Sequence, residues 1–374
     1  MKKKKLLEKI KLISSKNFKS LAPKIDFKKK FPKEITKLLD KDEINLLLGY
    51  HNNKKLSFNH KEECQFYFHA TKYCANIRNY FLVSLGMVGS TIMRYGTSAQ
   101  KKQFLHSTVN KGGISSLVIT EPNAGSNTKE ISTKYIKTKN GYLINGKKKW
   151  ITLGGISDTL LVLANGEQGL LLFIIASKTK GIKISEMKNI LTNRGSHIAE
   201  ISFDKVRVLD SDLIGNNIEV SSKALNYALT NGRVIASISA FSMCLAALEE
   251  AIDYTKNREQ FGKKIWNYQL IQKILADARV NISAGIAFTE NAFQKKRRIS
   301  IGSMNYCNMS KLFASQNVQQ ICSDLLDVYG ANGTSNEFNI ERYFRESKGF
   351  QFIEGTSQIL TQLIALNSIM GFEE

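Results

Sequence analysis

The spacing of apolar residues changes twice along this 374-residue chain, and these changes constrain the fold more than any other feature. Up to about residue 114 the pattern is helical, and the stretch 81–93 is apolar nearly all round, as in a buried helix. Between 115 and 216, short β-rich runs alternate with turn signals. From 217 the apolar positions again recur every three or four residues. The sequence therefore predicts an α+β multidomain protein with an α-helical N-terminal domain (1–114), a middle β-barrel or β-sandwich domain (115–216) and a C-terminal helical bundle (217–374).

Local signals predict several elements within these parts. The stretch 32–40 is expected to begin a helix with Pro32 in its first turn, and Ser98 is expected to cap another helix. Asn140-Gly141 predicts a hairpin turn between two strands. Further strands are expected at 115–119, 159–164, 169–176, 198–203 and 206–208.

The composition is that of a globular chain, with 43% hydrophobic and 23% charged residues. No apolar run reaches the roughly 18 residues that a membrane span needs. The basic start at 1–5 resembles a signal peptide, but charge returns at once in 6–10. We therefore expect a cytoplasmic protein without a membrane partner.

The formal net charge of +22 can be explained in two ways. One is an anionic partner, such as the phosphates of CoA, an acidic carrier protein or a nucleic acid. The other is lysine enrichment spread over every face, which fits the even spread of lysine and the presence of only 3 prolines. Charge alone therefore does not decide the function.

The cysteines and histidines lack the spacing of a metal site. His197 lies in a polar, turn-like stretch and is expected to be a structural hydrogen-bond donor. No CxxC pair is present, and we expect buried free thiols at Cys64, Cys74, Cys244, Cys307 and Cys322.

A carboxylate set among apolar residues stands near the C-terminus, where Glu354 follows 349–353 and precedes Gly355 and Thr356. Apolar surroundings disfavour the charged form of a carboxylate, so its pKa should rise toward the range of a general base. Gly355 lets another backbone or a flat cofactor approach closely. The alternative is a first-turn residue of the following helix, favoured there by the helix dipole.

Five motifs, in this order and over most of the chain, resemble those of the acyl-CoA dehydrogenase family. They are Ile119-Thr-Glu-Pro-Asn-Ala-Gly-Ser126, Lys149-Trp-Ile-Thr-Leu153, Arg258-Glu-Gln-Phe-Gly262, Tyr329-Gly-Ala-Asn-Gly333 and Ile353-Glu-Gly-Thr356. The resemblance implies a helical N-domain, a β-domain and a C-terminal four-helix bundle, with FAD between the last two and assembly as a homodimer or homotetramer.

The resemblance also implies the chemistry. Glu354 would take the proton α to a thioester carbonyl, the β-carbon would deliver hydride to flavin N5, and backbone and ribityl donors would bond the carbonyl as an oxyanion hole. Some relatives place the base on a bundle helix beside the arginine that matches Arg233, a substrate-site residue. The neighbour here is Gly232, so only Glu354 can serve.

Cofactor contacts carry over residue by residue from the resemblance. Thr120 and Ser126 would bond the pyrimidine edge and the pyrophosphate region, and Trp150 and Thr152 would lie at the isoalloxazine. Thr356 would lie close to the cofactor. The residues that would reach the FAD of a neighbouring subunit are Arg258, Phe261, Gln269, Gly330 and Gly333. Asp327, Ala331, Asn127 and Thr230 depart from the family pattern.

The substrate has alternative readings. The stretches 194–201 and 330–335 resemble the biosynthetic branch of the family, whose members oxidise groups on an acyl carrier protein. The other reading is an ordinary acyl-CoA dehydrogenase of fatty-acid or amino-acid catabolism. An outside alternative is a flavin-bearing nucleic-acid-binding protein, which the acidic end Glu373-Glu374 disfavours. The electron acceptor would be an electron-transfer flavoprotein or O2.

Overall fold

The computed structural model describes residues 2–49, 57–298 and 300–372, so Glu373 and Glu374 lie outside the described residues. The chain divides into two compact units. The first unit comprises Met1–Lys24, His60–Arg78 and Arg233–Glu374, and the second comprises Ile25–Asn59 and Asn79–Gly232. The predicted domain boundaries stay a prediction.

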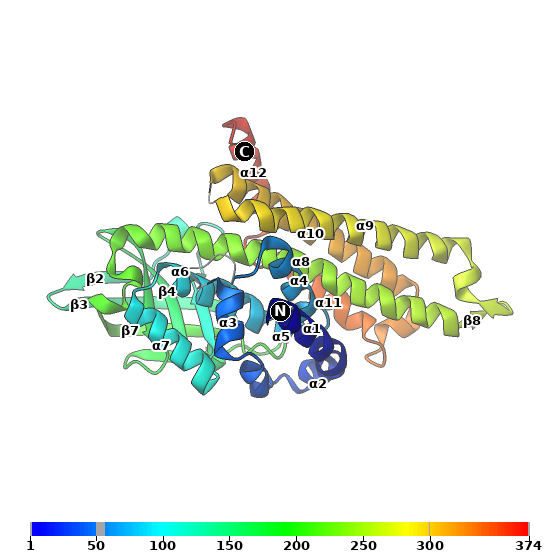
Figure 1. The fold of residues 1–374 in the computed structure, drawn as a ribbon, viewed down its shortest axis with the longest axis horizontal. Helices are drawn as coiled ribbons and strands as arrows, with labels where there is room; N and C mark the ends of the chain where they lie inside the picture. The colour runs from blue at the N-terminus through cyan, green and yellow to red at the C-terminus, as the bar shows by residue number, and fades with distance from the viewer. Residues whose placement is uncertain (1, 50–56, 299, 373–374) are drawn as a thin grey trace. The chain divides into compact units, whose positions relative to one another are not determined.

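A sheet forms the centre of the second unit (Figure 1). Its strands are β1 (Ser115–Val118), β2 (Lys134–Thr138), β3 (Gly141–Ile151), β4 (Thr159–Gly166), β5 (Gly169–Ala176), β6 (Ile182–Glu186) and β7 (Ala199–Leu209). The order is β1-β4-β2-β3-β7-β6, and β5 pairs with β4. The alternating apolar side chains of these strands form one core, in which the rings of Tyr135, Tyr142 and Phe173 meet edge to face.

The strand predictions are confirmed with three differences. Thr138 pairs with Gly141, so the predicted hairpin forms, but its turn residues are Lys139 and Asn140, and Gly141 opens the next strand. The stretches 198–203 and 206–208 belong to one strand, β7. The edge strand β6 was not predicted, because its side chains are mostly exposed and leave no apolar alternation.

The helices of the second unit confirm that the stretch 81–93 is buried. Two of the predicted helix starts are wrong. Tyr80–Gly89 (η3, π-helical) and Ser90–Tyr95 (α6) are almost wholly buried. Pro32 precedes only a short 3-10 helix, η2 (Lys33–Lys37), because Asp40 caps a new helix, α3 (Lys41–Leu48). Thr97, and not Ser98, caps α7 (Ser98–Leu105), since Gln100 stands three residues after Thr97 and completes a capping box. The π-helical η4 (His106–Asn110) follows α7.

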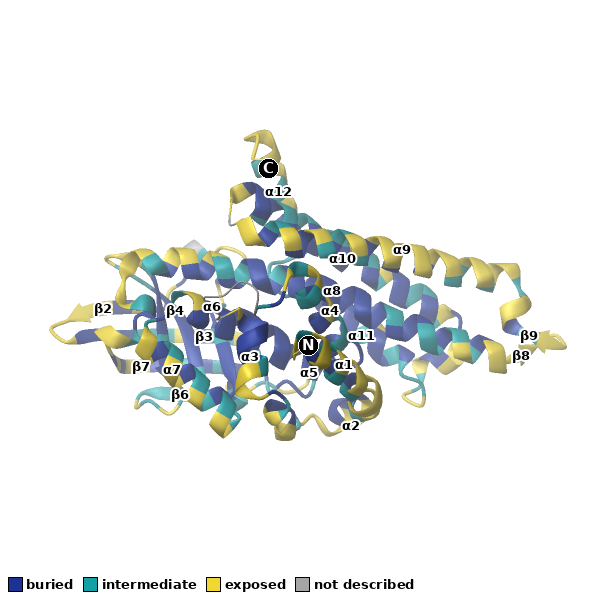
Figure 2. Cartoon of the chain, viewed as in Figure 1, coloured by how far each residue is buried: buried dark blue, intermediate teal, exposed yellow. Residues whose placement is uncertain are grey.

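Helices make up most of the first unit. They include α1 (Lys2–Ile13), α4 (His60–Thr71), α9 (Gln269–Lys295), α10 (Ile301–Asp327), α11 (Ile340–Gly349) and α12 (Ser357–Ile369). The helix α10 packs against α9, α11 and α12, and α4 packs against α1 and α9. The short strands β8 (Glu259–Gln260) and β9 (Lys263–Lys264) form a hairpin whose residues are mostly exposed (Figure 2). Two short elements, α2 (Lys19–Lys28) and α5 (Ala75–Asn79), span unit boundaries.

The longest helix, α8 (Ile218–Asn257), contains an 18-residue window with a mean hydropathy of 1.5. By length and composition this helix could cross a membrane, so the expectation that no stretch is long and apolar enough is wrong. However, 78% of the window is buried inside the protein, which is typical of a core helix.

All five cysteines are buried free thiols, as the sequence predicts. The Sγ atoms of Cys244 on α8 and Cys322 on α10 lie 3.6 Å apart. Burial raises the pKa of Cys244 and of Cys307, so these thiols stay protonated at neutral pH.

A Gly285→Ala substitution is expected to lower the free energy of unfolding by about 1–3 kcal/mol through overpacking. A Cβ at Gly285 on α9 would lie 2.1 Å from the ring of Phe241 on α8, and this buried ring cannot move aside freely. Denaturant unfolding measures the effect. Ala substitution of the exposed Val280 on the same helix is the control, and its effect should stay below about 0.5 kcal/mol. Equal stability of the Gly285 variant and the wild type would contradict this packing.

Candidate active site

Glu354 lies in a tight turn between α11 and α12 of the first unit. Its φ is 55° and that of Gly355 is 93°, so two successive residues adopt left-handed backbone conformations. Such a conformation is uncommon for a residue with a side chain, and it marks a position that its surroundings hold in place. Thr356 caps α12 by accepting a hydrogen bond from the backbone N–H of Ile359. Glu354 precedes this cap, so the alternative of a first-turn residue is wrong.

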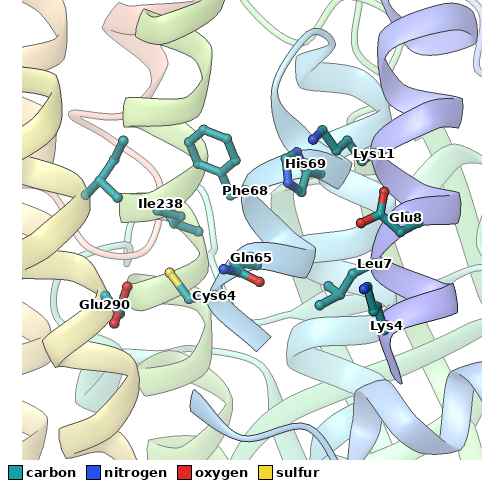
Figure 3. A pocket seen from close by; sticks show the side chains of 11 residues that line it. Lys4, Leu7, Glu8, Lys11, Cys64, Gln65, Phe68, His69, Ile238 and Glu290 are labelled. Carbon is teal, nitrogen blue, oxygen red and sulfur yellow. The ribbon is translucent and has the colours of Figure 1, made fainter. Parts of the chain in front are cut away.

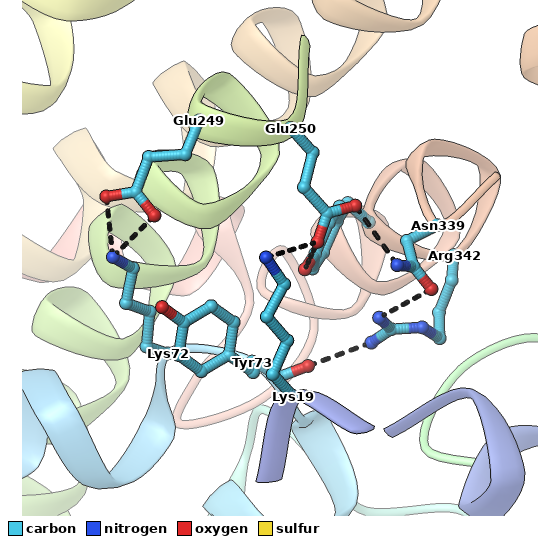
Figure 4. Close-up of polar contacts among 8 residues, drawn as sticks. Lys19, Lys72, Tyr73, Glu249, Glu250, Asn339 and Arg342 are labelled. Carbon is cyan, nitrogen blue, oxygen red and sulfur yellow. Dashed lines mark hydrogen bonds and ion pairs between the residues drawn. The ribbon is translucent and has the colours of Figure 1, made fainter. Parts of the chain in front are cut away.

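The helix α11, which leads into this turn, is anchored by a polar network (Figure 4). Asn339, at its start, donates to Glu250 of α8 at 3.0 Å, and Tyr343 donates to the other oxygen of the same carboxylate at 3.1 Å. The guanidinium of Arg342 donates to the backbone carbonyl of Tyr73 at 3.0 Å. These bonds fix where α11 ends and therefore where the turn that carries Glu354 begins.

Two cations hold the backbone of the Glu354 turn. Nε of Arg233, on α8, donates to the carbonyl oxygen of Glu354 at 3.3 Å, and Nη1 of the same side chain donates to Asn308 at 2.7 Å. Nζ of Lys311, on α10, donates to the carbonyl oxygen of Gly355 at 2.6 Å. The structure thus brings together the predicted residues Glu354 and Arg233 and adds Asn308 and Lys311.

The electrostatics of this turn favour a carboxylate that can gain and lose a proton near neutral pH. Burial raises the pKa of Glu354 to about 7, against the lowering effect of Arg233, Lys311 and Arg78. Burial likewise lowers the pKa of Lys311 to about 7 and lowers that of Arg233. A pKa near the working pH is the property expected of a general base.

The raised pKa of Glu354 predicts how catalysis depends on pH. A base must be deprotonated to accept a proton, so kcat/KM should rise about tenfold per pH unit below 7 and level off above it. Lys311 titrates in the same range, so the midpoint belongs to both groups. Steady-state rates from pH 5 to 9 measure this profile. An acidic limb with a midpoint near 4.5, the ordinary value for glutamate, would contradict the raised pKa.

The sequence contains a signal for Lys311, a residue that the motifs do not include. Lys311 continues the apolar stripe of α10 toward its N-terminus, three residues before Ala314 and seven before Val318. A lysine in such a stripe is either a snorkelling surface residue or a buried functional group. It is only 1% exposed here. Asn308 had no comparable signal, because its role depends on Arg233 from another helix.

The predicted flavin residues of the β-domain lie in the second unit. The backbone N–H of Lys149 donates to the carbonyl of Thr120 at 2.8 Å, so the stretches that carry Thr120 and Trp150 are neighbours. The pairing of β3 with β7 shifts register between Lys148 and Ile151, which is the mark of a β-bulge. Thr152, just after β3, accepts a hydrogen bond from Ser116 through its carbonyl. Ser126 is exposed in the loop after Thr120.

Trp150 is the feature here that best fits a flavin. The bulge gives it a φ of 63°, which is rare for an aromatic residue, and its indole is 52% exposed. A large apolar side chain in an unfavourable backbone conformation at the surface indicates a binding role, since it contributes little to the core. The residues therefore fit the isoalloxazine contact that the sequence predicts.

A buried ion pair supports the loop that begins at Thr120. Nζ of Lys148 lies 2.9 Å from Glu121, and the two side chains are 0% and 2% exposed. Lys148 also donates to the carbonyl of Ile119 at 2.8 Å. Burial raises the pKa of Glu121, but hydrogen bonds from Ser132, Thr133 and Lys148 outweigh this and lower it to about 2. The pair fixes the loop to β3 directly beside Trp150.

The residues predicted to reach a neighbouring subunit lie in the first unit. Arg258 and Gln269 are exposed on either side of the β8–β9 hairpin, and Phe261 at its tip is 94% exposed with a φ of 51°. Gly330 has a φ of 58° and open space where a Cβ would stand, whereas Gly333 is buried against Leu326 and Tyr329. Their contacts with a second copy stay a prediction.

His197 has a structural role within the second unit. Its Nε2 accepts a hydrogen bond from the backbone N–H of Phe31 at 3.1 Å, so Nδ1 carries the proton and donates to Glu186 at 3.0 Å. The predicted structural donor is therefore confirmed, and its second nitrogen is an acceptor.

The first unit also contains a cavity of about 550 Å³ that does not include Glu354 (Figure 3). Burial and the nearby Lys11 and Lys72 lower the pKa of His69 to about 4, so its imidazole is neutral at pH 7. Burial also raises the pKa of Cys64 and keeps its thiol protonated. Cys64 is therefore not a poised nucleophile, and the pKa of His69 is too low for a base matched to neutral pH.

Comparisons with known proteins identify the family of this chain. The model described as "Acyl-CoA dehydrogenase, middle domain" matches residues 116–206, and the "Acyl-CoA dehydrogenase, C-terminal domain" model matches residues 223–369. The chain belongs to the acyl-CoA dehydrogenase family, whose members are FAD-dependent oxidoreductases acting on the CH–CH bonds of acyl thioesters.

Individual relatives are similar over most of their length. The probable acyl-CoA dehydrogenase YngJ of Bacillus subtilis (strain 168) is 31% identical over 302 residues, which are 79% of this chain and 78% of that protein. The solved butyryl-CoA dehydrogenase of Megasphaera elsdenii has a TM-score of 0.90 at 24% identity and 98% coverage of both chains. The prolyl acyl carrier protein oxidase AnaB has a TM-score of 0.88 at 21% identity and 99% coverage of both chains. The predicted fold class is thereby confirmed.

Proposed function

We propose that this chain is an FAD-dependent dehydrogenase of an acyl thioester, in which Glu354 removes the α-proton. The observation that carries the proposal is a half-buried carboxylate in a left-handed turn, with its pKa raised to about 7 and its backbone bonded by Arg233 and Lys311. A second turn residue, Thr356, anchors the start of α12.

The residues of this chain would act as follows. Glu354 in its ionised form accepts the α-proton, and partial desolvation makes it a stronger base than an exposed glutamate. Arg233 and Lys311 bond the backbone carbonyls of the turn and hold the carboxylate in position. Trp150, Thr152, Thr120 and Ser126 would hold the flavin. Bound there, FAD would supply the acceptor for the hydride that leaves the β-carbon.

Either of two thioester carriers fits this chemistry. The charge of +22 supports an acidic carrier protein, because a basic surface speeds the docking of an acidic partner. Thr230 donates its hydroxyl hydrogen to the carbonyl of Asn226 on its own helix, so this hydrogen is already committed and not offered to a nucleotide. The name of the 31% identical relative supports CoA instead. We favour the carrier-bound thioester.

Anaerobic titration tests the proposal. One acyl group is presented on CoA and on an acyl carrier protein, and bleaching of the flavin is followed. We expect reduction with both, and steady-state turnover with an artificial electron acceptor should give a kcat/KM at least tenfold higher on the carrier. A large preference for CoA would contradict the proposal that the substrate is bound to a carrier protein. No flavin reduction across a panel of acyl groups would contradict the proposed dehydrogenase activity.

The exposed Phe261 at the β8–β9 tip supports assembly with a second copy of this chain. We therefore propose a homodimer or homotetramer in which Arg258, Phe261 and Gln269 reach the cofactor of the neighbouring copy. An electron-transfer flavoprotein is the proposed electron acceptor.

A further inference from the structure

Lys311 is a buried cation whose role the general chemistry of the family does not assign. It extends from the interior of α10, is 1% exposed, and donates to the carbonyl oxygen of Gly355 at 2.6 Å. A buried ammonium is costly unless it has partners, so its retention inside the first unit needs a reason.

The positions of the donors show what the cations do. Arg233 bonds the carbonyl of Glu354, and Lys311 bonds the carbonyl of the next residue, so two successive carbonyls of the left-handed turn each receive a charged donor. Charge-assisted bonds are about twice as strong as neutral ones. They hold a turn in which Glu354, a residue with a side chain, keeps an unfavourable φ of 55°.

The same arrangement leaves the carboxylate oxygens of Glu354 available to accept a proton. Within the described residues, neither Arg233 nor Lys311 forms an ion pair with the Glu354 carboxylate at bonding distance, because both bond backbone oxygens instead. Their charges still favour its ionised form through space, and so does that of Arg78 on α5. Arg78 also faces Glu346 of α11, which offsets part of its charge.

We propose that Lys311 is a positioning residue for the base: its ammonium holds the turn through Gly355 and supplies a positive charge beside the carboxylate without occupying the carboxylate oxygens. The inference rests on the proposed role of Glu354. It assigns Lys311 two separable effects, one through the hydrogen bond and one through the charge.

Direct titration of Glu354 tests the charge. The protein is labelled with [13Cδ]glutamate, and the Glu354 signal is identified as the one that Glu354→Gln removes. In the wild type its midpoint should lie near pH 7. In Lys311→Met and in Lys311→Gln it should rise by about one unit or more, since both variants lack the charge. Lys273→Met, an exposed lysine of α9, is the control and should cause no shift.

The hydrogen bond is tested by comparing the two variants. At pH 9 the base is ionised and Lys311, with its pKa lowered to about 7, is a neutral amine that still donates, so the comparison isolates the hydrogen bond from the charge. Gln keeps a donor for Gly355 and Met does not, so flavin reduction at this pH should fall about tenfold or more in Lys311→Met and less in Lys311→Gln. Unshifted midpoints in both variants, or equal reduction rates in both, would overturn the proposal. If the Met variant does not fold, the Gln variant alone decides the charge effect. The titration uses no substrate, so its failure is distinct from a wild-type protein that reduces no flavin.

Discussion

Glu354→Gln should bind flavin like the wild type and lose substrate-driven flavin reduction by roughly 10³-fold or more, since general bases contribute about 10²–10⁴-fold. The amide is nearly isosteric with the carboxylate, and the turn is held through backbone carbonyls that the substitution leaves in place. What disappears is the group that accepts the proton. Anaerobic rapid mixing with a reducing thioester measures the rate.

A matched control is Glu337→Gln, an exposed glutamate of the same unit. It should reduce flavin at the wild-type rate. If Glu354→Gln keeps more than a tenth of the wild-type rate with a full flavin content, Glu354 is not the base.

Glu354→Gln should also change how the free energy of unfolding depends on pH, in a direction that follows from the raised pKa. Between about pH 4.5 and 7 the folded protein holds a proton on Glu354 that the unfolded chain has lost, so stability falls as pH rises through this window. Glutamine has no such proton. The stability of Glu354→Gln relative to the wild type should therefore increase from pH 4.5 to 7 and stay level above pH 7.

Lys148→Met is expected to lower the free energy of unfolding by about 3–5 kcal/mol, because it leaves the buried Glu121 carboxylate without its cation. The loop from Thr120 should loosen with it, so flavin content should fall as well. Denaturant unfolding and the flavin-to-protein absorbance ratio are the measurements.

Two comparisons sharpen this test. Lys147→Met removes the neighbouring lysine, which pairs with Glu200 at 2.8 Å but is 53% exposed, and should cost less than about 1 kcal/mol. Adding Glu121→Gln to Lys148→Met removes the stranded charge and should recover part of the loss. Equal losses of unfolding free energy in Lys147→Met and Lys148→Met would show that the buried pair of Lys148 and Glu121 does not stabilise the fold.

Much of the fold could be read from the sequence because the periods of helix and strand differ so clearly. The parts that failed depend on information outside the local pattern. Strand β6 exists because β7 offers it an edge, and its own exposed side chains carry little signal. The cap at Thr97 was missed because two adjacent residues can both cap, and only Gln100 selects between them.

Only part of the candidate site could be predicted from the sequence. Glu354 stands out as a carboxylate among apolar residues, and the family motifs point to the same position. Lys311 and Asn308 lie more than 40 residues earlier in the chain, and nothing local shows that their helix meets the Glu354 turn. The bulge that turns Trp150 outward depends on the register of β3 against β7, which no single strand specifies.

Deuterium uptake tests the role of Glu354 most directly. The flavin-loaded protein is mixed in D2O, without an electron acceptor, with a thioester that reduces its flavin, and deuterium at the α-carbon is measured by mass spectrometry. The wild type should exchange the α-proton with solvent, and Glu354→Gln should exchange at least roughly 10³-fold more slowly. Wild-type exchange in Glu354→Gln would show that another group removes the proton.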